Sequence, residues 1–372
     1  MDKIVTKLRP VKTALKYRPN LFNRVYILIF LVALLSFFPV SQSMASRTLL
    51  GNIEKIVGDV RISKGWKKMQ PAKEGQKLYS GDKIKTLTNS RLYIRFKDGA
   101  DFKLGEKSSL RLKRSILNKG KKKQPTNNTE LLSGTLWASV DPLKKKAVFV
   151  VESPTAGVSI RGTELMAVVD KNVSTFFLKS GTIKVTGGDS QHILTPGEMT
   201  ANIGKRRLIT PIAIKGRKGL QEVEQRILAA TSMDSATSLK KRQNYGEILA
   251  RFYINYSSYL VDSGSYYDAI TMLLMAQSIS KNSDKHAEIS SLIANVNARF
   301  LKAYDEAAYH YQSILDNYPH SPYYEVTLFH YALLLQAQGD LEGANRLFNR
   351  YIKEYPNGKL AKTIKYNFLK KQ

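Results

Sequence analysis

The sequence predicts a multidomain chain in which an all-β region, built as a sandwich or a β-helix-like stack, precedes an all-α region of helical repeats. Apolar residues recur with period two between residues 50 and 215 and with helical spacing from about residue 220. The net charge also changes there, because residues 46–218 carry +21 of the total of +29 and residues 219–372 carry only +2. This shift in charge marks a domain boundary near residue 216.

The first 45 residues have the organisation of an export signal. An uncharged apolar run at residues 25–38 follows a segment with seven Lys or Arg residues, and Pro39 and then Ser43-Met44-Ala45 come after it. This pattern predicts a signal peptide cleaved after Ala45, or an uncleaved N-terminal anchor, since the basic flank is long for a signal peptide. A buried core helix is the third interpretation. Both leading interpretations place the rest of the chain outside the cytoplasm.

The sequence lacks the residues that common catalytic and metal sites need. It contains no cysteine, which excludes disulfides, thiol nucleophiles and thiolate metal sites. Its five histidines show no metal-binding spacing, and neither a Gly-x-Ser-x-Gly motif nor a phosphate-binding glycine loop occurs. We therefore expect no enzyme activity, no catalytic residue, no metal and no cofactor.

The clearest β element is a hairpin at residues 91–104. Leu92, Ile94 and Phe96 alternate with polar residues, so that Arg91 and its polar neighbours are expected to face water, and Asp98-Gly99 is a strong hairpin turn signal. A segment at 118–129 has no apolar period, and it is predicted to be an exposed loop. Further strands are expected at residues 57–62, 136–140, 148–151, 164–169, 175–178, 182–186 and 199–203.

Several blocks of this β region resemble the FecR domain. They are Gly58-Asp59-Val60-Arg61-Ile62, residues 75–86, residues 96–100, residues 132–136, residues 153–165, residues 178–185 and Pro196-Gly197-Glu198. Because the blocks follow the order of the family over some 150 residues, we assign a FecR-like β domain to residues 50–215.

The signature of this resemblance consists of Pro154, Thr155, Arg161, Gly162 and Thr163. Pro154 fixes φ and ends a strand, and Gly162 allows a close backbone approach. Arg161 is interpreted as a residue that ties neighbouring loops together by hydrogen bonds to their carbonyls, and the alternative is that Arg161 and Thr163 form a pair that contacts a partner.

The namesake FecR protein spans the inner membrane, acts on a sigma factor in the cytoplasm and receives a signal from an outer-membrane transporter. This sequence departs from that pattern, since only 24 residues precede the apolar run and helices follow the β domain. We therefore do not expect sigma-factor regulation to carry over.

The C-terminal region repeats itself. A linker helix is predicted within residues 216–244, with an apolar face of Leu220, Val223, Ile227 and Ala230, and repeats follow at residues 245–372. Aligned on alanine, the units are 38 and 37 residues apart. The repeat signature resembles the tetratricopeptide repeat, and its residues are Gly264, Ala269, Ala307, Pro319, Gly339, Ala344 and Pro356. This resemblance implies a solenoid whose concave face binds a protein segment, with most of its tyrosines packed between repeats.

Basic clusters are the strongest remaining functional signal, and they suggest contact with a polyanion or a partner. They comprise Lys113, Arg114, Lys119, Lys121, Lys122, Lys123, Lys144, Lys145, Lys146, Lys205, Arg206 and Arg207. Such charge would suit nucleic acid, but an exported domain meets lipid headgroups, lipopolysaccharide phosphates and peptidoglycan instead. A solvated basic surface is the plain alternative.

These observations predict a non-enzymatic periplasmic adaptor, either soluble or held at the inner membrane. Its β domain would contact an anionic envelope component or membrane partner, and its repeats would recruit an envelope protein. A FecR-type sensor linked to outer-membrane transport is the first alternative, and an exported nucleic-acid-binding protein is the second.

Overall fold

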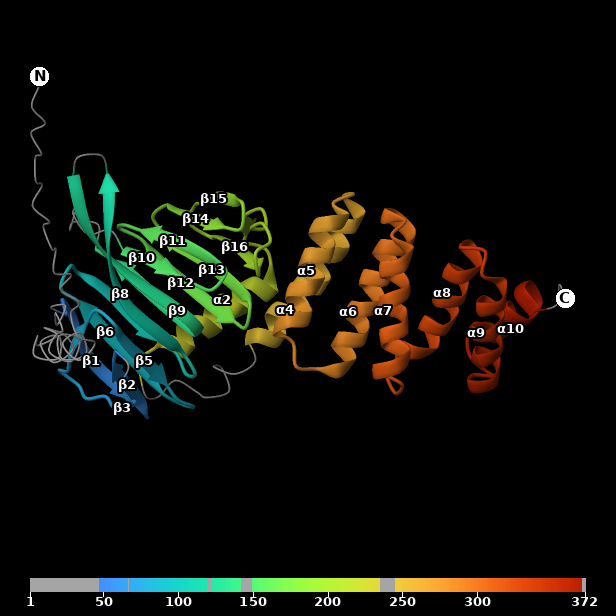
Figure 1. Ribbon diagram of the computed structural model, residues 1–372, viewed down its shortest axis with the longest axis horizontal. Helices are drawn as coiled ribbons and strands as arrows, with labels where there is room; N and C mark the ends of the chain where they lie inside the picture. Colours follow the sequence, from blue (N-terminus) through green and yellow to red (C-terminus); the bar gives the residue numbers. More distant parts are fainter. Residues whose placement is uncertain (1–46, 66, 120–121, 142–148, 235–244, 370–372) are drawn as a thin grey trace, which may run out of the picture. The chain divides into compact units, whose positions relative to one another are not determined.

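The computed structural model describes residues 47–65, 67–119, 122–141, 149–234 and 245–369 (Figure 1). Strands come first and helices follow, which confirms the predicted order of an all-β and an all-α region. Residues from Arg47 onward form one compact unit. The predicted export signal, with its cleavage site at Ala45, lies outside the described residues.

The strands of the first half are β1 Leu49–Val57, β2 Val60–Lys64, β3 Gln70–Pro71, β4 Lys77–Tyr79, β5 Asp82–Thr86, β6 Arg91–Phe96, β7 Ala100–Leu104, β8 Ser109–Lys119 and β9 Lys122–Val140. Those of the second half are β10 Phe149–Glu152, β11 Ala156–Ile160, β12 Glu164–Asp170, β13 Val173–Ser180, β14 Ile183–Gly187, β15 Ser190–Leu194, β16 Glu198–Ile203 and β17 Ile212–Ala213.

These strands form two sheets that share β9. Sheet A has the order β4–β1–β6–β7–β9–β12–β13–β16–β17. Sheet B has the order β3–β2–β5–β8–β9–β10–β11–β14–β15. Every described pairing is antiparallel except β9 with β10. The sequence left open whether the β region is a sandwich or a β-helix-like stack, and the two sheets show that it is a sandwich.

Strand β9 changes sheets at Gly134. Its earlier residues pair with β8 in sheet B, and residues 134–140 pair with β7 and β12 in sheet A. Gly134 has a φ of +94°, and a Cβ there would collide with Ser108. Only glycine allows both the left-handed backbone and this close approach, so Gly134 makes the corner possible.

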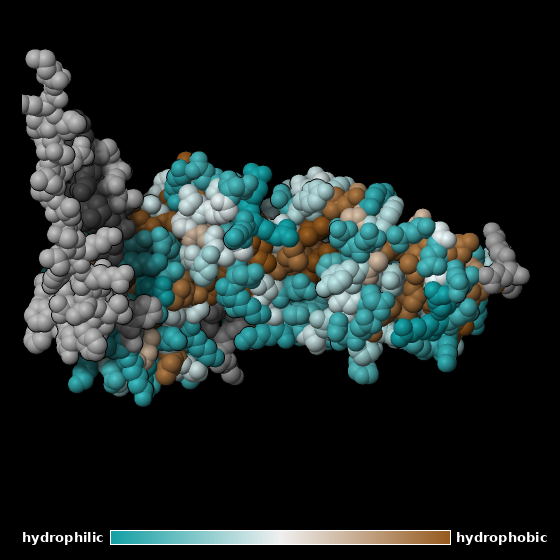
Figure 2. All heavy atoms as spheres, viewed as in Figure 1, coloured by the Kyte–Doolittle hydropathy of each residue, from teal (hydrophilic) through white to brown (hydrophobic). Residues whose placement is uncertain are grey.

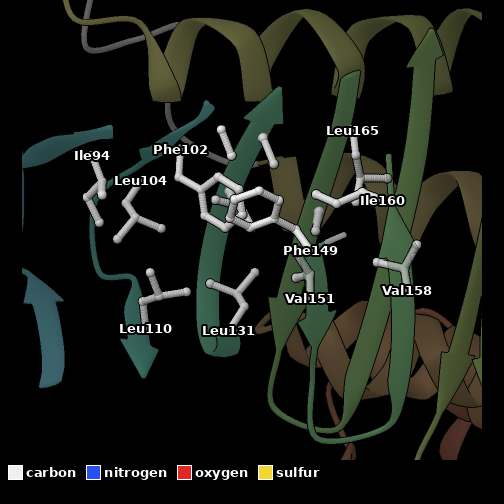
Figure 3. Packing of buried hydrophobic residues seen from close by; sticks show 14 of the residues in the cluster. Ile94, Phe102, Leu104, Leu110, Leu131, Phe149, Val151, Val158, Ile160 and Leu165 are labelled. Carbon is white, nitrogen blue, oxygen red and sulfur yellow. The ribbon is translucent and has the colours of Figure 1, made fainter. Parts of the chain in front are cut away.

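The main core lies between the two sheets (Figure 3). Phe96 and Phe102 of sheet A contact Phe149 of sheet B, with ring centroids 5.5 and 6.0 Å apart. Alternating apolar residues such as Ile94 and Leu110 complete this layer and are fully buried. Period-two alternation therefore places one face of each strand in the core.

The helices are α2 Lys218–Thr231, α4 Tyr245–Asp262, α5 Tyr266–Ile279, α6 Ser283–Val296, the π-helix η1 Asn297–Leu301, α7 Tyr304–Asn317, α8 Tyr324–Ala337, α9 Leu341–Glu354, α10 Ala361–Ile364 and the π-helix η2 Lys365–Leu369. Among the described residues, no helix combines the length and the apolar character that a membrane span requires.

A second core joins the outer face of sheet A to the helices. Phe177 of β13 and Met199 of β16 lie in one buried cluster with Val223 of α2, Tyr253 of α4 and Met272 of α5. The four apolar positions predicted for the helix in 216–244 are all buried in α2. The helix is therefore packed on the sheet and belongs to this core.

Two polar bonds reinforce this second core. The hydroxyl groups of Thr175 in β13 and Tyr253 in α4 are 2.9 Å apart and both buried. In the turn between β12 and β13, Asn172 accepts a hydrogen bond of 2.5 Å from Ser278 of α5.

Two sequence-based expectations are wrong. The exposed loop expected at residues 118–129 belongs to the β8–β9 hairpin, in which Asn118 pairs with Lys123 and Leu112 with Thr129. Strands pair through backbone hydrogen bonds, which do not require alternating apolar residues, so the hydropathy pattern did not reveal this hairpin. Arg91, expected to face water, is 2% exposed, because the C-terminal end of α2 covers it.

Candidate functional site

The outer face of sheet B is basic. Six bases on four strands alternate with core residues and point away from the core, and we name them the basic face: Arg61, Lys83, Lys85, Arg111, Lys113 and Lys184. Arg61 lies opposite Lys85, and Lys83 lies opposite Arg111. Like charges in directly opposed positions destabilise a sheet, so this arrangement has a cost that an anionic ligand would relieve.

Three carboxylates neutralise part of this face. Arg111 and Lys113 both lie 3.0 Å from Glu130, and Lys113 also lies 3.4 Å from Glu152. Burial disfavours the charged form of Lys113, but hydrogen bonds and charge from the two glutamates outweigh it and raise its pKa. Arg61 pairs with Asp59 at 2.7 Å. Lys85 and Lys184 form no ion pair with any described residue, so positive charge remains on this face.

A hollow of about 640 Å³ lies beside β2 and β3 at one edge of sheet B. We call it the lysine hollow, because Lys64, Lys67, Lys68 and Lys73 line it. The described residues form no ion pair with these four lysines. Glu74 also lines the hollow, but its carboxylate accepts a hydrogen bond of 2.8 Å from the backbone N–H of Ile56. Four lysines against one carboxylate give the hollow a net positive charge, as an anion site requires.

The predicted basic residues with described side chains lie in two separate places. Lys113 lies on the basic face and is ion-paired. Lys205, Arg206 and Arg207 are exposed after β16, and the Lys205 and Arg206 carbonyls crowd the β14–β15 turn at Gly188, at the other edge of sheet B from the lysine hollow. Arg114, Lys119, Lys122 and Lys123 have only their backbones described, in β8 and β9. Lys121, Lys144, Lys145 and Lys146 lie outside the described residues.

Sequence reasoning missed the lysine hollow. Four lysines occur between residues 64 and 73 without an acid among them, but they are not adjacent in the sequence as the predicted clusters are. A count of charge over ten-residue windows would have found them.

Thr155 lies in a buried polar network under the β10–β11 turn. Its hydroxyl is 2.6 Å from Ser174 Oγ and donates to Asn202 Oδ1 at 2.7 Å, while Asn202 Nδ2 donates to the Thr155 carbonyl at 2.8 Å. Pro154 is exposed in the same turn, which Ser153 closes by donating to the Ala156 carbonyl at 2.8 Å. These contacts fix the turn against β13 and β16.

Arg161, Gly162 and Thr163 form the corner at which the chain passes from β11 in sheet B to β12 in sheet A. A Cβ at Gly181 would come within 2.8 Å of the Gly162 carbonyl, and Gly181 has a φ of +85°, so this neighbouring corner requires glycine. The Thr163 carbonyl accepts a hydrogen bond of 3.0 Å from Val140. Thr163 is buried and therefore cannot contact a partner, whereas Arg161 is exposed.

In the helical region, the alanines of the repeat signature lie between helices. Ala269, Ala307 and Ala344 are buried in α5, α7 and α9. Gly264 and Gly339 adopt positive φ in the turns before α5 and α9. Pro319 and Pro356 are exposed just after α7 and α9.

The tyrosines of the repeats divide into two groups. Tyr253, Tyr311 and Tyr351 are fully buried, whereas Tyr259 and Tyr267 are exposed. Apolar side chains of the helical region also reach the surface in patches (Figure 2).

The histidines and carboxylates do not form a metal site. In the described part of the chain, no group of three or more His, Asp or Glu side chains is placed to hold a metal ion. Burial lowers the pKa values of His310 and His330, and the carbonyl of Ser280 lies 3.0 Å from His286 Nε2. The candidate site is defined by the lysines and arginines of the basic face and the lysine hollow.

Comparisons with known proteins agree with this division of the chain. The family profile described as FecR protein matches residues 82–202, and the tetratricopeptide repeat profile matches residues 292–321 and 327–358. No curated protein matches the sequence.

Two crystal structures of a candidate anti-sigma factor from Parabacteroides distasonis ATCC 8503, at 1.65 and 2.50 Å resolution, are 14% identical to this chain with a TM-score of 0.31. The match covers 38% of this chain and 64% of that protein. The chain thus contains a FecR domain followed by C-terminal tetratricopeptide repeats.

Proposed function

We propose that this protein is a non-enzymatic adaptor of the cell envelope that works outside the cytoplasm. Its FecR domain holds an anionic envelope component, and its tetratricopeptide repeats recruit a protein. Families of these two kinds generally bind and do not catalyse.

The observation that carries the proposal is the positive charge gathered on sheet B and in the lysine hollow at its edge. The basic face opposes like charges across two strand pairs, and the lysine hollow adds four lysines that pair with no acid of the described residues. Arranged on one sheet, these charges suit a repeating anion such as lipid headgroup phosphates, lipopolysaccharide phosphates or peptidoglycan carboxylates.

The packing of the helices supports an adaptor role. Because sheet A, α2, α4 and α5 share one buried cluster, the first repeat helices are fixed to the sandwich. A ligand on sheet B and a protein on the repeats would then be held by one continuous body.

Location outside the cytoplasm rests on the apolar run at residues 25–38 with its basic flank. Cell fractionation with N-terminal sequencing tests it. A mature chain that begins at Ser46 in the periplasm, or an intact chain in the inner membrane, is expected. Recovery of the intact chain in the cytoplasm would contradict the proposal.

Binding of the full chain to peptidoglycan sacculi, lipopolysaccharide and anionic-lipid vesicles, each over a range of salt concentrations, tests the anionic ligand. The variant in which Lys64, Lys67, Lys68 and Lys73 are all changed to Glu should bind its anionic target about tenfold more weakly or worse, with a smaller salt dependence.

The matched control changes four exposed lysines of the C-terminal helices, Lys353, Lys359, Lys362 and Lys365, to Glu. This control has the same net charge as the lysine-hollow variant. Because its changes lie on the C-terminal helices and not at sheet B, it should keep the wild-type affinity. Equal losses in both variants would show that net charge alone drives binding, and absence of binding by the wild type at low salt would reject the anionic ligand.

A further inference from the structure

A pocket of about 470 Å³ lies between two repeats, where α6 passes through η1 into α7 and faces α8. We call it the η1 pocket. Its apolar part consists of Ala298, Leu333 and Leu334, and its polar part includes Arg299, Lys302 and His330. None of its lining residues is acidic.

The backbone that forms this pocket is unusual for a helical repeat. Helix α6 ends in the π-helix η1, and Lys302 follows with a φ of +56°. A left-handed conformation is unfavourable for a residue other than glycine, and π-helical turns are frequent at functional sites. The Lys302 ammonium donates a hydrogen bond of 3.0 Å to the Arg299 carbonyl, which holds this turn together. The strained turn places both cations at the same pocket.

The charge in the η1 pocket is uncompensated. Arg299 forms no ion pair with any described residue, and the Arg299 charge acts on its neighbours. Burial is the main cause that lowers the pKa of His330, and the charge of Arg299 lowers it further. Burial raises the pKa of Tyr311 to about 12, and the charge of Arg299 opposes this increase. His330 Nδ1 is buried without a hydrogen-bond partner. A positive, partly apolar pocket with one unsatisfied buried nitrogen suits a polar ligand that brings its own negative charge.

We infer that the η1 pocket binds an acidic segment of the recruited protein, in which a carboxylate side chain stands beside an aliphatic one. The carboxylate pairs with Arg299 and Lys302, and the aliphatic side chain covers Ala298, Leu333 and Leu334. Guanidinium–carboxylate pairing fixes the orientation of the segment, and the apolar contact excludes water from it. This inference rests on the proposed function, since it names the chemistry of the protein that the repeats recruit.

Peptide binding by the full chain tests the inference. The probes are fluorescein-labelled, end-capped peptides Gly-Leu-Glu-Leu-Gly and Gly-Leu-Gln-Leu-Gly, measured by fluorescence anisotropy. The glutamate peptide should bind at least about tenfold more tightly than its glutamine counterpart, as expected for a charge-assisted pair. The double variant Arg299→Gln with Lys302→Asn should remove this preference. Asparagine tolerates the left-handed turn, so the variant should fold.

The matched control, Lys353→Gln with Lys362→Asn, removes two exposed lysines elsewhere in the C-terminal helices and should retain the preference. Equal binding of the two peptides, or a preference that survives the Arg299 and Lys302 changes, would overturn the inference.

Capture of partners from cross-linked envelopes with the same variants separates the inference from the proposed function. If the wild type captures a protein and the double variant captures it equally well, the η1 pocket is not the binding site, although the adaptor role stands. If the wild type captures no protein, the adaptor role fails, and the peptide experiment alone decides whether the pocket binds an acidic segment.

Discussion

The two sheets of the sandwich share a core and a strand, but their outer faces differ in kind. The outer face of sheet A carries apolar residues such as Met166 and Phe177 on β12 and β13, and helices α2, α4 and α5 bury this part of it. The outer face of sheet B carries the basic face, and its residues remain at least partly exposed. The helix-covered part of sheet A is therefore interior to the molecule, whereas sheet B presents charge to the surroundings.

This difference shows where the β domain can bind and where it cannot. A ligand on the helix-covered part of sheet A would have to displace a hydrophobic cluster. A ligand on sheet B would meet exposed basic side chains, of which Lys85 and Lys184 form no ion pair with any described residue. The following predictions test this comparison, from the largest expected effect to the smallest.

Truncation of a buried outer residue of sheet A should have the largest effect. Phe177→Ala empties a fully buried position between β13 and the helices and should lower the free energy of unfolding by about 3–5 kcal/mol. Ile193 is 65% exposed on the outer face of sheet B, so Ile193→Ala should change it by less than about 0.5 kcal/mol. Urea unfolding of both variants measures this contrast, and equal effects would contradict it.

Substitutions of two arginines of β6 should also differ in their effect on stability, because one side chain is buried and the other is exposed. Arg91 is buried and donates to the carbonyls of Ser232 and Asp234, the latter at 2.9 Å. Arg91→Leu leaves those carbonyls without their donor and should destabilise the fold by about 1–3 kcal/mol. Arg95→Leu breaks only an exposed pair with Asp101, which should cost at most about 1 kcal/mol. Thermal unfolding separates them, and a larger loss from Arg95→Leu would reject burial as the cause.

The bond between β13 and α4 should make a smaller contribution. Tyr253→Phe removes the hydroxyl that meets Thr175 and leaves a buried Thr175 oxygen unpaired, at a cost of about 1 kcal/mol. Burial raises the pKa of Tyr253 well above its ordinary value, so its hydroxyl stays neutral at physiological pH. Tyr259→Phe, at an exposed position of α4, should have no measurable effect on chemical denaturation.

The smallest effect should depend on pH. Burial opposes the charge of Glu247 in α4, but hydrogen bonds from the Lys281 backbone and from Lys285, at 2.7 and 2.6 Å, together with one from Ser280, outweigh it and lower its pKa. The charge of Glu247 therefore stabilises the fold fully at pH values above 4.5, the ordinary pKa of a glutamate. This stabilisation is lost as the pH falls through the lowered pKa.

Glu247→Gln should accordingly destabilise the protein at pH 7 by at most about 1 kcal/mol and flatten the loss of stability below pH 4.5. Unfolding free energies measured from pH 3 to pH 7 test this, and a variant with an unchanged acid slope would refute the assignment.

The sequence predicted the sandwich core well because alternation is visible along each strand. Leu92, Ile94 and Phe96 are buried as expected. The covering of sheet A was not predicted, although the unbroken apolar run from Leu165 to Val169 in β12 is typical of a strand buried on both faces.

The site was harder to predict because its residues meet across strands. The pairs Arg61–Lys85 and Lys83–Arg111 are defined by strand register, which a search for adjacent lysines does not detect. The η1 pocket depends on a π-helix and a left-handed lysine, and neither has a sequence signal of its own.

The contact of α4 and α5 with sheet A has a consequence for the end of the solenoid. A stack of helical repeats needs a terminal unit that shields its last apolar surface from water. Here the sandwich itself acts as that cap, since Leu249, Tyr253 and Met272 are buried together with β-strand residues. Repeats excised from this chain at residue 245 would expose that surface and are expected to self-associate, whereas the intact chain keeps it buried.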